Sequence, residues 1–314
     1  MNENFKLIII GFGVQGKKRS KIAGKAVVAI VDINPKNSHY RDVKDVPLDK
    51  YDAALICTSD NAKIEIIKYL LSNKKHVLVE KPVLSSDHKD FNEIQNLAKI
   101  NNVVCYTAYN HRFEPHYIRM AELLKSQQLG KIYSIRMFYG NGTARIVRDS
   151  LWRDKASGVL TDLGSHLLDT LDYWVSGIRK LDFDIIGAFS HENKSFDHVL
   201  IFNSTKFVIQ LEVSLLSWKN TFSCDVICEK GSAHIDSLCK WGPSTFTIRR
   251  RIFPSGIPSE EKVILSQVDP TWENEYHFFL SLCSKVENNM IEKDMWLNNT
   301  MMKLSEKVNV KHVN

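Results

Sequence analysis

The sequence lacks any apolar run close to the ~18 residues that a membrane-spanning helix needs, which argues against an integral membrane protein. Its first apolar run, Leu7–Ile10, is too short for the core of a secretory signal peptide, and Met1–Lys6 before it carries one acid and one base. Internal repeats and low-complexity linkers are also absent. Because 44% of the residues are hydrophobic and 25% charged, a mostly disordered chain is excluded, and we expect a cytoplasmic globular protein.

The six cysteines include no Cys-x-x-Cys pair. Two of them, Cys57 and Cys105, lie in apolar runs that resemble strands. In a chain without an export signal, buried free thiols are favoured over disulfides or zinc ligands. We therefore expect no disulfide and no metal site.

An aromatic-basic motif of the kind found in nucleic-acid-binding proteins is missing, although the formal net charge is +6. The densest basic cluster, Arg249–Arg251, lies in an alternating segment that predicts a strand. A solvated strand face is therefore favoured over a nucleic-acid site. The mild positive balance also suits ligands that carry phosphate.

The first third of the chain alternates short apolar runs with helical patterns. The runs are continuous rather than alternating, which is typical of parallel strands that are covered on both faces. Predicted strands are Leu7–Ile10, Val27–Val31, Ala53–Cys57, His76–Val79 and Val103–Tyr106, and predicted helices are Ala62–Leu71 and Asp87–Ile100. This alternation predicts a doubly wound α/β domain over residues 1–118.

The remainder, residues 119–314, predicts an α+β domain with a mostly antiparallel sheet. Strand-like segments are Lys131–Tyr139, His198–Ser214, Phe222–Asp236 and Ser244–Phe253, and helical segments are Glu114–Ser126, Val159–Val175 and Thr271–Val308. Glu229-Lys230-Gly231 predicts a hairpin turn. The C-terminal helices could pack back on the first domain.

A glycine-rich loop, Gly11-Phe12-Gly13-Val14-Gln15-Gly16, directly follows the first strand and opens a helix. In a Rossmann domain these glycines allow a tight turn, close approach of a pyrophosphate, and packing of helix on strand. Asp32 closes the second strand, where a carboxylate binds the ribose hydroxyls and repels a 2′-phosphate. We therefore predict NAD rather than NADP, held by Gly11, Gly13, Val14, Gln15, Gly16 and Asp32; a solvated Asp32 is the alternative.

The helix Val159–Val175 has an apolar stripe and, opposite it, a polar stripe that includes Asp162, His166, Asp169 and Tyr173. Asp162 and His166 are four residues apart and so neighbours on one face. A carboxylate beside an imidazole can orient a general base and stabilise its charged form. The same pair could be a surface salt bridge or part of a metal site, but zinc lacks further ligands at suitable spacing.

At this point the chain resembles the Gfo/Idh/MocA oxidoreductases. The likeness covers the glycine loop with Arg19, Asp52–Thr58, Lys75–Pro82 with its Glu80-Lys81-Pro82 signature, Tyr109–Phe113 and Ser157–Asp169. It continues weakly through the Glu229–Gly231 turn and Trp272–Phe279. Together these motifs are specific for the family, but none is specific for a substrate.

The resemblance implies catalytic roles for Lys81, Asp162 and His166. His166 would exchange a proton with the substrate hydroxyl, Lys81 would hydrogen-bond the same oxygen, and Asp162 would hold or tune the pair. Thr58, Glu80 and Lys81 would line the cofactor. Candidates for the substrate wall are Asn110, Arg112, Trp152 and Arg153, although either arginine could equally be structural.

The resemblance further implies an NAD-dependent oxidoreductase that acts on a secondary alcohol of a sugar, a cyclitol or a nucleotide sugar, with a mild preference for the last. The partners expected are this small molecule and further copies of the chain, as a dimer or tetramer, with no nucleic acid and no membrane. Alternatives are a reductase of a C=N bond or a linear tetrapyrrole, and a catalytically silent regulator that binds the dinucleotide.

Two departures from the family pattern affect the cofactor pocket. Where the family often has Thr-Pro-Asn-x-x-His, this chain has Thr58-Ser59-Asp60-Asn61-Ala62-Lys63, which leaves the cofactor contacts of that loop in doubt. The segment from Asn34 to Asp52 is short and contains Pro35 and Pro47. The usual helix after the second strand is therefore expected to be missing, and the adenine side of the pocket more open.

Overall fold

The computed structural model describes residues 5–36, 38–150, 154, 157–287 and 291–311. The chain forms two compact units: the first comprises residues 1–110 and 271–298, and the second comprises residues 111–270 and 299–314. The sequence predicts a domain boundary after residue 118 and leaves open whether the C-terminal helices pack on the first domain. The first unit includes residues 271–298 because their apolar side chains join its core, as described below.

A five-stranded parallel sheet with the order β2-β1-β3-β4-β5 forms the centre of the first unit. Its strands are β1 (Leu7–Ile10), β2 (Val27–Val31), β3 (Ala53–Ile56), β4 (His76–Glu80) and β5 (Cys105–Ala108). The five predicted strands are confirmed to within two residues at each end. In such a sheet the carboxyl ends of the strands share one edge, and ligands bind there.

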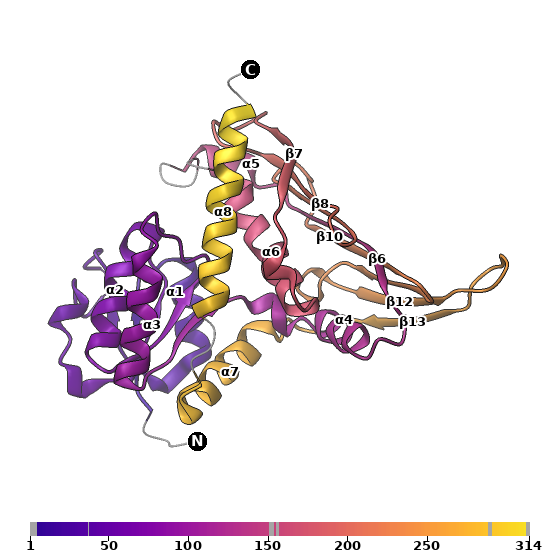
Figure 1. Ribbon diagram of the computed structural model, residues 1–314. Coiled ribbons are helices and arrows are strands. Elements are labelled where there is room, and N and C mark those ends of the chain that lie inside the picture. Colours follow the sequence, from indigo (N-terminus) through magenta and orange to yellow (C-terminus); the bar gives the residue numbers. More distant parts are fainter. Residues whose placement is uncertain (1–4, 37, 151–153, 155–156, 288–290, 312–314) are drawn as a thin grey trace. The chain divides into compact units, whose positions relative to one another are not determined.

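Helices cover the sheet of the first unit (Figure 1), and α1, α2 and α3 also connect its strands. They are α1 (Val14–Ala23), α2 (Asp60–Ser72), α3 (Lys89–Asn101) and α7 (Thr271–Lys285); α8 (Ile291–Lys311) begins in this unit and ends in the second. Between β2 and β3 the described residues form no α-helix, as the sequence predicts. Two 3-10 turns, Val43–Asp45 and Leu48–Lys50, stand there, and Tyr40 forms a single bridge to Val31.

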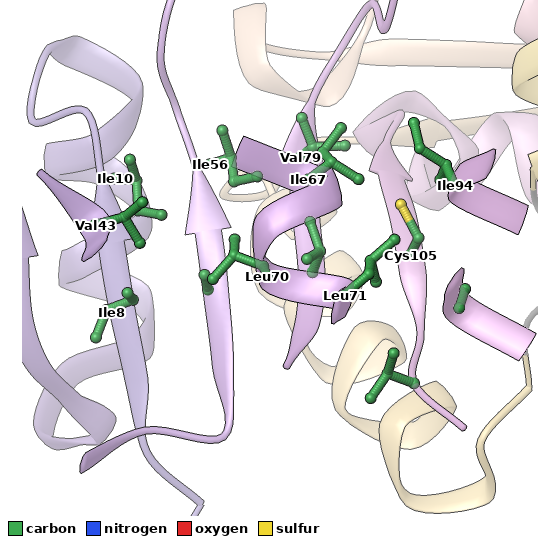
Figure 2. Packing of buried hydrophobic residues seen from close by; sticks show 14 of the residues in the cluster. Ile8, Ile10, Val43, Ile56, Ile67, Leu70, Leu71, Val79, Ile94 and Cys105 are labelled. Atoms are coloured by element: carbon green, nitrogen blue, oxygen red, sulfur yellow. The ribbon is translucent and has the colours of Figure 1, made fainter. Parts of the chain in front are cut away.

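Apolar side chains alternate between the two faces of this sheet and are buried on both. Figure 2 shows Ile8, Ile10, Ile56 and Val79 on the face that packs against Ile67, Leu70 and Leu71 of α2 and Ile94 of α3. On the opposite face Leu7, Ile9 and Leu55 pack with Phe279 and Leu282 of α7. This burial explains why α7 belongs to the first unit although it lies far along the chain.

An eight-stranded, mostly antiparallel sheet forms the second unit, with the order β13-β12-β11-β10-β6-β9-β8-β7. Its strands are β6 (Ile132–Gly140), β7 (Asp184–Phe189), β8 (His198–Asn203), β9 (Val208–Ser214), β10 (Thr221–Cys228), β11 (Gly231–Asp236), β12 (Ser244–Arg250) and β13 (Glu260–Leu265). Its one parallel pair is β6 with β9. The predicted hairpin is confirmed: Cys228 pairs with Gly231 across the Glu229-Lys230 turn.

The helices of the second unit are α4 (Pro115–Lys125), α5 (Ala144–Arg148) and α6 (Ser165–Trp174). A π-helical segment, Leu160–Gly164, precedes α6, so the helix that the sequence predicts as one regular element starts in a wider coil. In the predicted polar stripe, His166 and Asp169 are buried, and Asp162 and Tyr173 are half-buried. π-helical turns are frequent at functional sites.

Three predictions from the sequence concern disulfides, the basic cluster Arg249–Arg251 and membrane-spanning helices. All six cysteines lie in the described part of the chain, and none of them forms a disulfide. Arg249 and Arg250 form ion pairs with Glu260 and Glu261 on the neighbouring strand, as expected for a solvated strand face. Among the described residues, no helix is both long and apolar enough to cross a membrane.

Candidate active site

The glycine loop has the backbone geometry that the Rossmann pattern requires. Gly11 has φ +88°, and a Cβ there would lie 2.7 Å from the Cys57 carbonyl oxygen; a Cβ on Gly16 would lie 2.0 Å from the Gly11 oxygen. Gly13, by contrast, has nothing within 4 Å of an added Cβ. Packing inside the protein therefore requires glycine at positions 11 and 16, whereas Gly13 leaves open space beside the N-terminus of α1.

The first turn of α1 suits an anion because it contains no acidic residue. Val14 is 83% exposed and Gln15 is also exposed, so the helix terminus is accessible. These residues and the open space at Gly13 fit the pyrophosphate of a dinucleotide.

Asp32 connects two loops at the carboxyl edge of the sheet. One of its carboxylate oxygens accepts a hydrogen bond from the Phe12 amide at 2.5 Å, and the other accepts one from the Asn34 amide at 2.8 Å. A carboxylate has about four lone-pair positions, so capacity remains for the hydroxyls of a ribose. Asp32 is partly buried rather than fully solvated.

A buried charge network anchors the end of β4. The Nε of Arg19 donates to Glu80 at 2.8 Å, and its Nη2 donates to Glu275 of α7 at 2.6 Å. The Trp272 ring lies 4.4 Å from the guanidinium. Glu80 is thus held by the protein itself, and Lys81 follows it at the carboxyl edge.

One cation, Arg19, thus pairs with two buried acids, Glu80 and Glu275. Burial and the nearby Glu80 raise the pKa of Glu275 to about 7, while Arg19 opposes this shift. Burial also acts to lower the pKa of Arg19, but the two carboxylates more than offset it.

The loop after β3 reaches the same edge. The Oγ1 of Thr58 is buried, and the described residues offer it no hydrogen-bond partner. Lys63 on α2 is buried as well, with its Nζ 2.7 Å from Asp60 and 2.9 Å from the Pro82 carbonyl oxygen. The loop that departs from the family pattern therefore contacts the turn that follows Lys81.

Asn110, a predicted substrate-wall residue, is buried at the end of β5. Its Nδ2 donates to the Thr271 Oγ1 at 2.8 Å, at the start of α7. The structure thus gives Asn110 a role in joining α7 to the sheet of the first unit.

In the second unit His166 lies in a cluster of aromatic and basic side chains. Its ring stacks on that of His111, with centroids 4.1 Å apart and 23° between the planes. The Tyr139 ring lies 5.4 Å from His111 and 6.0 Å from His166. His166 is 7% exposed, so neighbouring side chains restrict the orientation of its imidazole.

Lys240 completes this cluster. Its ammonium lies 3.1 Å from the Nε2 of His111 and donates to the Tyr139 hydroxyl at 3.2 Å. Because an ammonium can only donate, the Nε2 of His111 is the acceptor, which is the arrangement of a neutral imidazole. The segment that carries Lys240 is held by Glu114, whose carboxylate accepts from the amide and thiol of Cys239. Burial raises the pKa of Glu114.

Arg112, another residue predicted for the substrate wall, binds two carboxylates of α6, those of Asp169 and Asp172. It donates from Nε and Nη2 to Asp169 at 2.8 and 3.0 Å, and from Nη2 to Asp172 at 3.0 Å. This bidentate pairing with two carboxylates favours the structural reading of Arg112. The other predicted wall residues, Trp152 and Arg153, lie outside the described residues.

The structure groups the predicted residues by unit. The first contains the glycine loop, Asp32, Thr58, Glu80, Lys81 and Asn110, and the second contains Arg112, Asp162 and His166. Sequence reasoning missed Glu275, Lys240 and Tyr139 as members of these clusters. His111 and Lys63 were quoted only as parts of motifs. Long-range contacts place these residues, so no local spacing could have identified them.

Comparisons with known proteins match both units. Residues 5–109 match the family described as "Oxidoreductase family, NAD-binding Rossmann fold", and residues 117–234 match "GFO/IDH/MocA C-terminal domain".

Among curated proteins, the chain is 26% identical over 187 residues to glucose-6-phosphate 3-dehydrogenase of Bacillus subtilis, covering 54% of this chain and 53% of that protein. It is 31% identical over 86 residues to myo-inositol 2-dehydrogenase of Thermotoga maritima, covering 27% and 25%. The matched stretches thus span about half or less of these relatives.

Among solved structures, levoglucosan dehydrogenase in complex with NADH superposes with a TM-score of 0.80 at 16% identity, covering 97% of both chains. At that identity the likeness shows the fold. The two matched domains show that this chain belongs to the Gfo/Idh/MocA family and that its first unit is an NAD-binding Rossmann domain.

Proposed function

We propose that the protein is an NAD-dependent oxidoreductase that interconverts a secondary alcohol and the corresponding ketone of a sugar, a cyclitol or a nucleotide sugar. The observation that carries the proposal is the carboxyl edge of the first unit's sheet. There the glycine loop follows β1, and Lys81 follows β4 after a glutamate fixed by Arg19. A cationic side chain at the nucleotide-binding edge suits a reaction in which negative charge develops on oxygen.

The nucleotide would be held by the glycine loop and the exposed start of α1, with Asp32 at the ribose. When bound, NAD supplies or accepts the hydride. The chain's own residues position the substrate and handle the proton. A carboxylate at Asp32 repels a 2′-phosphate, which supports NAD over NADP.

In the direction of oxidation, His166 takes the hydroxyl proton on an imidazole nitrogen, and in the reverse direction it returns the proton. Lys81 donates a hydrogen bond to the same oxygen. Asp162, on the π-helical turn before α6, orients the imidazole or stabilises its protonated form. The proposal requires Lys81 and His166 to reach one substrate oxygen. The stacking of His166 on His111 supports it because a general base works best in a fixed orientation.

The test is a spectrophotometric assay of NADH formation with a panel of glucose 6-phosphate, myo-inositol, levoglucosan and UDP-sugars. Wild type is compared with Lys81→Ala and His166→Ala. We expect turnover by wild type on at least one compound and a loss of about 10²- to 10⁴-fold in the His166 variant, the usual contribution of a general base.

Lys68→Ala serves as a control because Lys68 lies on α2, where its ammonium binds Asp90 and Glu93. NADH titration by fluorescence, run alongside, checks that each variant still binds the nucleotide. Equal turnover in all four proteins would reject the roles given to Lys81 and His166. Nucleotide binding without turnover on any sugar would favour a regulator or a reductase of another bond.

A further inference from the structure

A serine, a histidine and an aspartate are joined by hydrogen bonds on the eight-stranded sheet of the second unit. The Oγ of Ser232 lies 2.8 Å from the Nε2 of His234, and the Nδ1 of His234 lies 2.6 Å from the Oδ1 of Asp225. Ser232 and His234 alternate with Ala233 on β11, so both side chains leave the same face, and Asp225 on β10 pairs directly with His234. The proposed oxidoreductase reaction uses none of these side chains.

The face that carries this cluster is accessible to small molecules. Val226 and Ala233, which point to the other face of the same strands, are 0% exposed. By contrast, 47% of the Asp225 side chain and 19% of the His234 side chain are exposed, and Ser232 is half-buried. A reagent can therefore reach the serine, while the imidazole lies between its two cross-strand neighbours, Asp225 and Thr247 of β12.

The aspartate determines the direction of both hydrogen bonds. A carboxylate only accepts, so the Nδ1 of His234 carries the proton that it donates to Asp225. In the neutral imidazole the Nε2 is then an acceptor, and the Ser232 hydroxyl donates to it. The hydroxyl thus faces a base that a third group orients, which is the arrangement of an activated serine nucleophile.

The neighbours of Ser232 indicate which compounds it can attack. It pairs with Ile227 of β10 on one side and with Arg249 of β12 on the other. Ile227 is 39% exposed and offers an apolar contact. The Arg249 side chain is 40% exposed and bonded to Glu260, so it gives a developing oxyanion only weak stabilisation. Such a site suits esters that a good leaving group already activates.

We propose that Ser232, His234 and Asp225 form a second reactive site that hydrolyses aryl esters of short carboxylic acids without the nucleotide. The Ser232 Oγ bonds to the carbonyl carbon while its proton passes to the Nε2 of His234. The bond from carbon to the aryl oxygen then breaks, the phenol leaves with that proton, and the acyl group stays on Ser232.

Water completes the reaction. Its oxygen bonds to the acyl carbon as one of its protons passes to His234. The bond from carbon to the Ser232 Oγ then breaks, the carboxylic acid leaves, and His234 returns the proton to the serine. Asp225 is a positioning residue, because it acts only by orienting the imidazole and fixing its proton on Nδ1.

The first experiment is labelling of the purified protein with diisopropyl fluorophosphate in the absence of NAD, read by peptide mass spectrometry. The Ser232 oxygen displaces fluoride from phosphorus, so labelling needs only the nucleophile and its base. We expect label on Ser232 in wild type and labelling about 10²-fold slower in His234→Ala, the lower end of what a general base contributes. Ser223→Ala is the matched control and should behave as wild type, because Ser223 lies on the same face of β10 but pairs with Phe138 and Asp236.

The second measurement is hydrolysis of p-nitrophenyl acetate, followed by the release of p-nitrophenolate. Ser232→Ala should be slower than wild type by about tenfold or more, whereas Ser223→Ala should match wild type. Wild type that has been labelled with the fluorophosphate should match Ser232→Ala. NADH titration by fluorescence checks that each variant is folded.

The test of Asp225 is the position of the imidazole proton, observed by ¹⁵N NMR of histidine-labelled protein with His234→Gln for assignment. In wild type the proton should lie on Nδ1. In Asp225→Ala nothing fixes it there, so part of the population should carry it on Nε2, and labelling of Ser232 should slow. A wild-type proton position and labelling rate in Asp225→Ala would contradict the positioning role.

Wild-type protein that takes no label on Ser232 would overturn the proposal. So would labelling of Ser232 at the wild-type rate in folded His234→Ala or His234→Gln, and so would equal release of p-nitrophenolate by wild type and Ser232→Ala. These measurements need neither a sugar nor NAD turnover, so the proposed function and the second site can fail independently.

Discussion

The imidazole rings of His111 and His166 stack face to face at 4.1 Å between centroids, and the Nε2 of His111 is held by the ammonium of Lys240 at 3.1 Å. The residue proposed as the base is thus oriented by a second histidine that is itself fixed. Tyr139 borders both rings and accepts from the same lysine. This chain of contacts makes the orientation of His166 sensitive to residues that need not touch substrate.

Replacing His111 should lower turnover without abolishing it. An aromatic pair contributes about 0.5–1.5 kcal/mol, so His111→Ala is expected to reduce kcat up to about tenfold. His111→Phe keeps a ring against His166 and should lose less. The measurement is kcat and KM on the most active sugar of the panel; an unchanged kcat in His111→Ala would contradict the positioning role.

Lys240→Met should reproduce the effect of His111→Phe, because both remove the same hydrogen bond. Residues that act as a unit are not additive, so the double variant should be no worse than the more affected single variant. Steady-state kinetics on the four proteins of this cycle test the coupling. Fully additive losses would show that Lys240 acts independently of His111.

Two glycine substitutions should have different consequences. Gly16→Ala places a Cβ 2.0 Å from the Gly11 carbonyl oxygen, so the loop must deform and the melting temperature should fall. Gly13→Ala meets nothing within 4 Å and should leave the melting temperature unchanged while weakening NADH binding. Thermal melts and NADH fluorescence titrations separate the two. Full NADH affinity in a folded Gly13→Ala protein would place the nucleotide elsewhere.

The Arg19–Glu275 ion pair should matter more to stability than a surface pair of equal length. Both it and Arg249–Glu260 have N–O distances of 2.6 Å, but the side chain of Glu275 is 0% exposed, whereas that of Glu260 is 49% exposed. Removing one partner of a buried pair costs about 3–5 kcal/mol. Glu275→Ala should therefore unfold at much lower urea concentration than wild type, and Glu260→Ala at nearly the same concentration. Equal urea midpoints for Glu275→Ala and Glu260→Ala would contradict the buried charge network of Arg19, Glu80 and Glu275.

The pH dependence of stability should also report on Glu275. Its pKa in the folded protein, about 7, lies above the ordinary value of a glutamate, so the folded state holds the proton more tightly than the unfolded state. This group's contribution to stability is thus most favourable below pH ~4.5 and falls as the pH rises through ~7.

Because Glu275→Gln cannot titrate at this position, its free energy of unfolding should lack the pH dependence that Glu275 contributes. Urea unfolding of wild type and variant at several values between pH 5 and pH 8 provides the comparison, with Glu260→Gln as the control. Parallel curves for wild type and Glu275→Gln would show that the carboxyl is ionised throughout this range.

The sequence predicted the first unit's sheet well because its strands are short, continuous apolar runs between helices. It missed β13, whose residues Glu260–Leu265 are mostly polar and exposed, and β7, which alternates weakly. The π-helical start before α6 was not predictable either. A π-helical turn contains more residues than an α-helical turn, but the difference is too small to show in the spacing of the apolar residues of Val159–Val175.

For the candidate site, the glycine loop and Lys81 could be located because local spacing and strand ends place them. Arg19 and Glu275 are 256 positions apart in the chain, and Lys240 and His111 are 129 apart. Such partners meet only through tertiary structure, so the sequence offered no pattern for them. Arg112 shows the converse limit: its residue type suits anion binding, but its Nε and Nη2 already donate to Asp169 and Asp172.

The double use of Asp32 bears on any attempt to redesign cofactor preference. Exchanging this acid for a small or basic residue is the obvious route toward a phosphorylated ribose, yet the same carboxylate also accepts from the amides of Phe12 and Asn34. A substitution there would release two backbone segments as well as remove a charge. An engineer would therefore need compensating changes in both loops, and a single exchange should yield an enzyme that binds either nucleotide poorly.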